Sequence, residues 1–134
     1  MTPEELIAKA AEARDAAYAP YSSFSVGAAL LTKDGVVIPG ANVENASYGL
    51  TVCAERNAFF RAVHDGHRHF TELAVVTEPG ASMCGACRQV AREFAPELRV
   101  HLADTAGRFR TVTLKELLPD SFGPEMLQRP DSVN

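Results

Sequence analysis

The sequence predicts an α/β fold, with helices on the faces of a mixed β-sheet. Segments with helical spacing of apolar residues alternate with short apolar runs in the order helix, strand, strand, helix, strand, helix, strand, strand. This alternation is typical of a sheet packed against helices. Residues 103–108 alone join the last two strands, whereas a parallel pair needs a crossover of about a dozen residues. The last pair is therefore expected to be antiparallel.

The first helix is expected between Thr2 and Tyr18. Thr2 has the position of an N-cap, Pro3 that of the first helical residue, and a glutamate stands three residues after the cap. Pro20 disfavours the helical conformation at the residue before it, so the helix should stop near Tyr18. The apolar residues of this helix are mostly alanines, which implies close packing against another element.

Two strands joined by a tight turn follow the first helix. Residues 24–32 form an apolar run typical of a strand buried on both faces, and residues 36–41 form the return strand. The Asp34-Gly35 pair between them is a hairpin turn signal. Residues 42–50 are polar and contain glycine, which indicates a loop of the kind that often carries binding residues.

Two amphipathic helices and three further strands complete the pattern. The expected helix at 53–64 has apolar residues at helical spacing and ends at Asp65-Gly66, and the expected helix at 84–94 repeats that spacing. Apolar, β-branched runs predict the strands. A mobile segment is expected from Arg129. The other expected elements are strands at 72–77, 98–102 and 109–113, a loop at 78–83, and short helices at 114–118 and 122–127.

Length and composition limit the functional classes. A chain of 134 residues with 46% hydrophobic residues fits one domain, 1–134. The net charge of −4 and the absence of a basic run argue against a nucleic-acid or membrane-surface binder. No run approaches the roughly 20 apolar residues of a membrane span, and the acidic N-terminus has no signal-peptide pattern. Three cysteines cannot all pair within one chain, which favours reduced thiols and a cytoplasmic location.

The three cysteines fall in two motifs that indicate a metal site. Cys53 and Glu55 form a Cys-x-Glu pattern, and Cys84 and Cys87 form a Cys-x-x-Cys pattern. Cys53 and Cys84 lie where helices are expected to begin, and the positive end of a helix dipole favours the thiolate. Three thiolates leave the fourth tetrahedral position of Zn²⁺ open for water, as in a catalytic zinc site.

Two charged residues follow Cys53 along its helix. Glu55 is placed to reach a metal-bound water without ligating the metal, and a carboxylate there can take up and deliver a proton. A zinc ion with three thiolates has a net charge of −1, which opposes acidification of that water. Arg56 is a candidate to offset this charge through a hydrogen bond to a ligand sulfur, and an ordinary surface arginine is an equally good interpretation.

With these motifs the chain resembles the cytidine deaminase family, in its small, homotetrameric three-cysteine form. The two cysteine motifs follow the zinc-deaminase signature with its non-ligating glutamate. The resemblance extends over nearly the whole chain. Further similar stretches are Tyr18-Ala19-Pro20-Tyr21-Ser22, Phe24-Ser25-Val26-Gly27-Ala28, Asn42-Val43-Glu44-Asn45, Ser47-Tyr48-Gly49 and Glu116-Leu117-Leu118-Pro119.

The resemblance implies both a fold and a reaction. The fold is a three-layer α-β-α arrangement whose five-stranded mixed sheet ends in an antiparallel pair. The reaction is zinc-dependent conversion of free cytidine and deoxycytidine to uridine and deoxyuridine, with release of ammonia, in pyrimidine salvage. Cys53, Cys84 and Cys87 would bind one zinc ion per subunit. Zinc-bound hydroxide would attack C4 while Glu55 shuttles protons between the water, N3 and the leaving ammonia.

The resemblance also implies substrate contacts within one chain. Phe24 would pack against the pyrimidine, and the backbone of Ala54 would bind the pyrimidine edge. Asn42 and Glu44 would bind ribose hydroxyls. Without the resemblance, the better interpretations would be an ordinary turn residue for Asn42, a loop charge for Glu44 and a packed aromatic for Tyr48.

A homotetramer is the assembly that the resemblance implies. Neighbouring subunits would complete each pocket, so that Tyr48 and Phe122 act in trans. The expected partners are therefore a small nucleoside and further copies of this chain, without nucleic acid or membrane.

One residue departs from the family pattern. Proline usually precedes the second cysteine, and here Met83 stands in its place. Because proline fixes φ and removes an N–H donor, Met83 is expected to leave the turn into the helix looser. Replacement of Met83 by proline is therefore expected to raise the thermal stability.

Other interpretations are open from the sequence. A thioredoxin-like redox pair at Cys84 and Cys87 would leave Cys53 and Glu55 without a role. A purely structural zinc needs a fourth protein ligand, which one of the four histidines would have to supply. A deaminase of a modified cytosine nucleoside, of the blasticidin type, is the alternative enzyme. A non-catalytic zinc-binding module is a third alternative. A deaminase that edits polynucleotides is a fourth, which the acidic composition and the antiparallel last strand pair disfavour.

Overall fold

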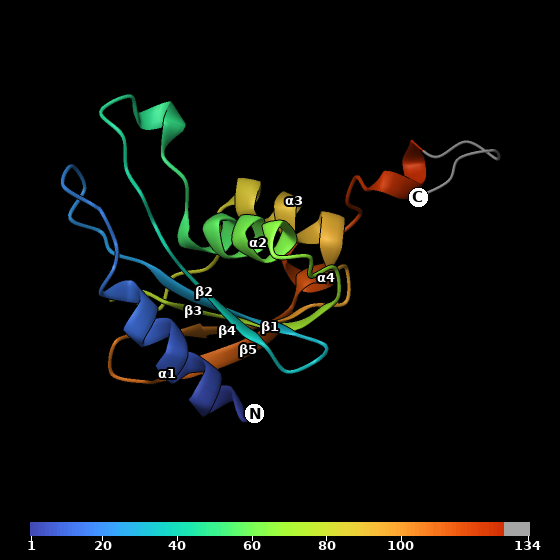
Figure 1. The fold of residues 1–134 in the computed structure, drawn as a ribbon, viewed down its shortest axis with the longest axis horizontal. Coiled ribbons are helices and arrows are strands. Elements are labelled where there is room, and N and C mark those ends of the chain that lie inside the picture. The colour runs from blue at the N-terminus through green and yellow to red at the C-terminus, as the bar shows by residue number, and fades with distance from the viewer. Residues whose placement is uncertain (128–134) are drawn as a thin grey trace.

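The computed structural model describes residues 1–127 and contains one five-stranded mixed sheet with helices on both faces. Figure 1 shows α2 and α3 side by side on one face of the sheet and α1 on the other. The predicted α/β fold is confirmed, and the expected mobile segment from Arg129 lies outside the described residues. In chain order the elements are α1 (Pro3–Arg14), β1 (Gly27–Thr32), β2 (Val37–Ala41), η1 (Tyr48–Leu50), α2 (Ala54–His64), β3 (Phe70–Val76), α3 (Gly85–Phe94), β4 (Arg99–Ala103), β5 (Phe109–Thr113), α4 (Leu114–Leu117) and η2 (Pro124–Met126).

The strand order across the sheet is β2-β1-β3-β4-β5. β3 and β4 run parallel and are connected through α3, while the other three neighbouring pairs are antiparallel. The last pair is antiparallel as predicted, with Arg99 opposite Thr113 and Ala103 opposite Phe109. The tight connection between these strands is closed by a backbone hydrogen bond of 2.9 Å from Asp104 N–H to the Arg108 carbonyl.

The sheet separates two apolar cores. On β3, Leu73 and Val75 face the core formed with α2 and α3, whereas Ala74 and Val76 face the smaller core formed with α1. This alternation follows from the two-residue period of a strand. All six positions of β1 are buried because both faces of this strand are covered, as its continuous apolar run predicts.

Two glycines allow both helical layers to approach the sheet closely. A Cβ atom added to Gly27 on β1 would lie 2.0 Å from the Ala10 carbonyl oxygen of α1. A Cβ atom added to Gly40 on β2 would lie 2.4 Å from the Ala54 carbonyl oxygen of α2. Gly40 therefore helps to determine how near the first turn of α2 comes to the sheet.

The first helix is shorter than predicted and ends at Arg14. Thr2 caps its N-terminus as expected, and its Oγ1 accepts a hydrogen bond of 3.2 Å from Glu5 N–H. Tyr18 lies outside the helix because its backbone pairs with the segment after β2. Its N–H donates to the Asn42 carbonyl, and its carbonyl accepts from Glu44 N–H, both at 2.9 Å.

The strand predicted from residue 24 begins only at Gly27. The side chain of Asn42 binds the backbone of the preceding residues, since its Oδ1 accepts from Val26 N–H at 2.9 Å and its Nδ2 donates to the Phe24 carbonyl at 2.8 Å. Residues 24–26 are therefore held by the side chain of Asn42, together with a backbone hydrogen bond of 3.4 Å from its N–H to the Val26 carbonyl. The loop predicted at 42–50 contains the short helix η1, and the last predicted helix is reduced to η2.

The turn into α3 is more firmly held than the sequence suggests. Met83 is only 2% exposed and belongs to the core between the sheet and the helices α2 and α3. The Arg88 Nε donates a hydrogen bond of 2.8 Å to the Met83 carbonyl, and a terminal nitrogen of the same guanidinium donates to Ser82 Oγ at 3.1 Å. The side chain of Met83 thus fills the core, and Arg88 fixes the backbone of the turn.

The buried position of Met83 reverses the expected effect of a proline. Full burial of a methionine side chain stabilises a protein by about 1.5–3 kcal/mol, whereas restricting the unfolded chain with proline contributes about 0.4–1 kcal/mol. We therefore expect Met83→Pro to lower the melting temperature in thermal unfolding. Met83→Leu, which keeps the volume, is the control and is expected to cost less than about 1.5 kcal/mol. An increase in the melting temperature of Met83→Pro would restore the expectation from sequence.

Candidate active site

Two helix N-termini bring the three cysteines together. Cys53 is the N-cap of α2, Cys84 is the N-cap of α3, and Cys87 lies in the first turn of α3. The Sγ atoms of Cys53 and Cys84 are 3.8 Å apart, and those of Cys84 and Cys87 are 3.3 Å apart. All three sulfur atoms lie within 4.8 Å of one another. Parts of the chain 31 positions apart in sequence therefore form one cluster.

This cluster fits a tetrahedral zinc ion. Zinc–sulfur bonds of about 2.3 Å in a tetrahedron place neighbouring sulfur atoms about 3.8 Å apart. The separation of 3.8 Å between Cys53 and Cys84 matches this value, and the separation of 3.3 Å between Cys84 and Cys87 needs only a small adjustment. Cys87 is buried and Cys84 is exposed, so the cluster opens on one side. The three thiols can therefore hold zinc and leave one coordination position accessible.

The thiols form an asymmetric hydrogen-bonded group. A hydrogen bond with Cys87, supported by Arg56, lowers the pKa of Cys53 to about 5. The same contact with Cys53, together with burial, raises the pKa of Cys87. These shifts favour ionisation of Cys53 over that of Cys87. A thiolate is the form that ligates zinc.

Glu55 is a buried carboxyl group in the first turn of α2. Its exposed fraction is 4%, and burial raises its pKa to about 7. The negative charge of Cys53 raises this pKa further, and Arg56 opposes the increase. A carboxyl group with this pKa exchanges its proton near neutral pH, which is suited to general acid–base catalysis.

Arg56 lies against the sulfur cluster, as one of the two interpretations of the sequence requires. Its terminal nitrogen donates to Cys53 Sγ and to the Thr51 carbonyl, both at 3.4 Å. Hydrogen bonds to Cys53 raise the pKa of the guanidinium, so its charge is permanent. Its Nε is buried and has no hydrogen-bond partner among the described residues.

Asn42 and Glu44 form a second polar group beside the loop that carries Phe24. Asn42 binds the backbone on both sides of Ser25, as described above. Glu44 accepts hydrogen bonds from the N–H groups of Tyr21, at 2.9 Å, and of Ser22, at 3.1 Å. The Ser22 hydroxyl also donates to Glu44, and this bond lowers the pKa of Glu44. Both side chains therefore determine the shape of the loop.

These contacts leave part of the hydrogen-bonding capacity of both side chains free. An ionised carboxylate offers about four acceptor positions, and an amide offers two donor hydrogens and two lone pairs. Glu44 uses three acceptor positions, and Asn42 uses one hydrogen and one lone pair. Each side chain therefore keeps the capacity to bind a further polar group.

Two residues that the sequence analysis did not single out connect these groups. Ser22 links Glu44 to Phe24, since its Oγ also accepts a hydrogen bond of 3.0 Å from Phe24 N–H. Asn57 on α2 donates to the Ala41 carbonyl at 2.8 Å, which ties the sulfur-bearing helix to the end of β2. Ser22 stands in one of the stretches that carry the family resemblance, but its partner lies 22 positions away and is not visible in the sequence.

The remaining candidate substrate residues are placed differently. Ala54 is the first residue of α2 and is buried next to the sulfur cluster. Tyr48 is 64% exposed and packs edge-to-face on Tyr21, with ring centroids 5.8 Å apart. Phe122 is 54% exposed. The segments that carry Tyr48 and Phe122 project from opposite sides of the molecule, which η1 and the red C-terminal segment mark in Figure 1. The structure therefore does not bring these two rings to one site within the chain.

Comparison with known proteins agrees with this site. The profile of the cytidine and deoxycytidylate deaminase zinc-binding region matches residues 1–102. The chain belongs to the cytidine deaminase family. A cytidine deaminase of Halalkalibacterium halodurans is 52% identical over 93% of this chain and 97% of its own length. A crystal structure of the cytidine deaminase from Burkholderia pseudomallei superposes with a TM-score of 0.89, at 52% identity, over 91% of this chain and all of that one. A blasticidin-S deaminase of Bacillus cereus is 34% identical over 70% of this chain and 74% of its own.

The position of Arg56 leads to a prediction about metal affinity. We expect Arg56→Ala to weaken zinc binding by about 10- to 100-fold, because loss of a group that hydrogen-bonds a ligand has effects of this size. Competition with a chromophoric chelator measures the affinity. Arg61→Ala is the matched control, since Arg61 is an exposed arginine on the same helix. Equal zinc affinity in the two variants would show that Arg56 is an ordinary surface residue.

Proposed function

We propose that this enzyme catalyses the zinc-dependent hydrolytic deamination of free cytidine and deoxycytidine to uridine and deoxyuridine, with release of ammonia. The observation that carries the proposal is the pairing of three sulfur atoms at tetrahedral spacing with one buried carboxyl group two residues from a ligand. In this proposal Cys53, Cys84 and Cys87 hold one zinc ion per subunit. When bound, zinc would act as a Lewis acid that lowers the pKa of a coordinated water and makes hydroxide available at neutral pH.

The proposed role of Glu55 is to move protons between water and substrate. Its raised pKa allows it to accept a proton from the attacking water and to deliver it to N3 of the pyrimidine. A second transfer to the amino nitrogen turns the leaving group into ammonia. Addition of water at C4 and loss of ammonia then balance the reaction, since the substrate amino group is exchanged for oxygen. Arg56 would offset the negative charge of the three thiolates.

The proposed nucleoside site extends from the sulfur cluster toward the loop that Asn42 and Glu44 support. Phe24 packs against the pyrimidine, and the backbone of Ala54 binds the pyrimidine edge. The donor left on Asn42 and the acceptor position left on Glu44 are suited to ribose hydroxyls. The identity of 52% to a cytidine deaminase, against 34% to a blasticidin-S deaminase, favours ordinary cytosine nucleosides. Comparison of cytidine and blasticidin S by ultraviolet absorbance would decide between them.

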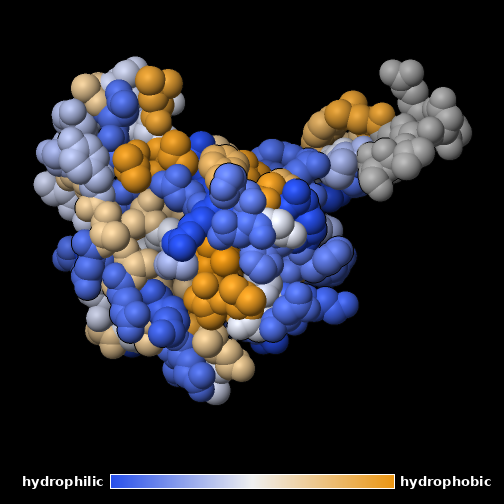
Figure 2. All heavy atoms as spheres, viewed as in Figure 1, coloured by the Kyte–Doolittle hydropathy of each residue, from blue (hydrophilic) through white to orange (hydrophobic). Residues whose placement is uncertain are grey.

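We further propose that the chain forms a homotetramer in which Tyr48 and Phe122 complete the pockets of neighbouring subunits. Both projecting segments carry exposed apolar side chains, which are orange in Figure 2. Exposed apolar side chains gathered on projecting segments are typical of protein interfaces. The exposed apolar residues are Val43 and Leu50, beside the exposed ring of Tyr48, on one segment, and Phe122, Met126 and Leu127 on the other.

The proposed setting is pyrimidine salvage in the cytoplasm. The net charge of −4 and the three unpaired thiols support a small-molecule enzyme in a reducing compartment. Among the described residues, no helix combines the length and apolar character needed to cross a bilayer. The shared sheet and its two cores support the proposal that residues 1–134 form a single catalytic domain.

Replacement of Glu55 by glutamine tests the catalytic role directly. We expect Glu55→Gln to keep stoichiometric zinc and to lower kcat by about 10³-fold, because the amide cannot carry a proton. Ammonia release from cytidine and metal content are measured on the same samples. Glu12→Gln, which changes an exposed glutamate of α1, is the control. Stoichiometric zinc in the unaltered protein without ammonia release from any cytosine nucleoside would identify a non-catalytic zinc-binding module instead.

Mixed assemblies test the contribution of Phe122 across subunits. We expect Phe122→Ala to raise KM for cytidine by about tenfold, the size of effect that one lost aromatic contact produces. Coexpression of Phe122→Ala chains with Glu55→Gln chains should restore the original KM in part of the active sites, because the catalytically inactive chain supplies an intact Phe122. A mixture of Glu55→Gln and unaltered chains is the control. If all active sites in the first mixture keep the raised KM, Phe122 acts within its own chain.

A further inference from the structure

Helix α3 presents polar side chains to the C-terminal segment, residues 118–126. Gln89 Nε2 donates a hydrogen bond of 2.9 Å to the Phe122 carbonyl. Arg92 Nε donates to Ser121 Oγ at 2.8 Å, and a terminal nitrogen of the same guanidinium pairs with Glu125. These bonds reach the residue before Phe122, the backbone of Phe122 itself and a residue just beyond it. Within residues 1–127, the side chains of Ser121 and Glu125 form hydrogen bonds with α3 and with no other element.

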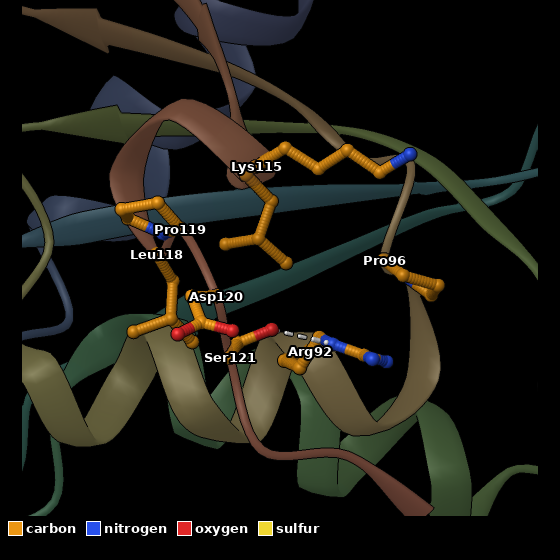
Figure 3. A pocket seen from close by; sticks show the side chains of 8 residues that line it. Arg92, Pro96, Lys115, Leu118, Pro119, Asp120 and Ser121 are labelled. Carbon is orange, nitrogen blue, oxygen red and sulfur yellow. Dashed lines mark hydrogen bonds between the residues drawn. The ribbon is translucent and has the colours of Figure 1, made fainter. Parts of the chain in front are cut away.

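The segment that leads to Phe122 borders an open hollow. The hollow has a volume of about 390 Å³ and is lined by residues of α3, α4 and the segment 118–121, with Leu114 and Leu118 among them. Figure 3 shows the Arg92 side chain reaching Ser121 at this hollow. The hydrogen bonds from Gln89 and Arg92 are therefore direct restraints on the positions of Ser121 and Phe122 beside this hollow.

The missing side chain of Gly123 leaves space for the Arg92 guanidinium. The residue is buried and its φ of −147° is accessible to any amino acid. A Cβ atom at this position would lie 2.5 Å from a terminal nitrogen of Arg92 and 2.6 Å from the guanidinium carbon. A side chain at this position would therefore displace the Arg92 guanidinium, although the backbone conformation would accept it.

The same helix holds two of the proposed zinc ligands. Cys84 caps α3 and Cys87 lies in its first turn, while Gln89 and Arg92 follow on the next turns. Arg88 adds a further link, since its guanidinium binds the Met83 carbonyl and also the Leu117 carbonyl, the latter at 2.6 Å. A rigid helix thus connects the sulfur cluster of one chain to the segment that carries Phe122.

We propose that Arg92, assisted by Gln89, is a positioning residue that sets the place of Phe122 in the substrate pocket of a neighbouring subunit. The inference rests on the proposed role of Phe122 in trans. It adds a specific cause for that role. The guanidinium binds the side chains of Ser121 and Glu125 on both sides of Phe122, Gln89 binds the Phe122 carbonyl, and together they set the direction in which the ring projects. Arg92 itself does not touch the nucleoside.

Steady-state kinetics with cytidine on the zinc-loaded tetramer test this inference. Arg92→Met keeps the length of the side chain and removes its donors. We expect KM to rise by about tenfold while kcat changes by less than about twofold, with unchanged zinc content and oligomeric state. Gly123→Ala, which displaces the guanidinium without altering Arg92, is expected to give the same split between KM and kcat. Arg99→Met, an exposed arginine on β4, is the matched control and should leave both constants unchanged.

A double variant decides whether Arg92 acts through Phe122. In the Phe122→Ala background we expect Arg92→Met to cause no further rise in KM, since residues that act through one contact are not additive. Independent multiplication of the two effects would overturn the inference, as would a fall in kcat accompanied by loss of the tetramer or of zinc. If Phe122→Ala raises KM and Arg92→Met does not, the inference fails while the proposed function of Phe122 stands. If Phe122→Ala leaves KM unchanged, the role of Phe122 in trans fails and the inference fails with it.

Discussion

The meeting of two helix N-termini at three sulfur atoms is the constraint on which this fold depends. Cys53 and Cys84 cap α2 and α3, so the positive ends of both helix dipoles point at the place where negative charge gathers. The sheet must hold the two helices side by side for this to happen. The close approach that Gly40 allows, and the tie from Asn57 to the end of β2, bring α2 into that position.

The charges of Cys53, Glu55 and Arg56 lie close together in a partly buried site and shift one another's pKa values. A buried carboxyl group beside a thiolate is costly to ionise, and the pKa of Glu55 is raised accordingly. Arg56 opposes this effect and also stabilises the Cys53 thiolate. Arg56 therefore adds to the effect of Cys87 on the pKa of Cys53 and moderates the effect of burial on the pKa of Glu55. The first turn of α2 makes this balance possible, because Glu55 and Arg56 follow Cys53 by two and three positions and so lie close to its sulfur atom.

Polar side chains also hold the irregular segments around the site. Asn42 and Glu44 shape the loop before β1, Arg88 fixes the turn before α3, and Gln89 and Arg92 bind the segment after α4. Asn42, Glu44, Arg88 and Gln89 bind the backbone of segments that lack a neighbouring strand or helix, and Arg92 binds side chains of such a segment. Buried or partly buried backbone groups need such partners when no regular structure supplies them. The loop before β1, the turn before α3 and the segment after α4 are thereby connected to the helices and strands.

The sequence by itself determined the order of the elements, the antiparallel last pair, the three sulfur ligands and the neighbouring Glu55. These features depend on local periodicity, on loop length and on spacing within a short motif, all of which are present in the linear chain. Only the tertiary structure decided that Met83 is a core residue, that Ser22 supports Glu44 and Phe24, and that α3 holds the backbone at Phe122. The partners in the last two cases lie 22 and 33 positions apart in sequence. Such contacts arise from the way the sheet and helices pack, and no local pattern records them.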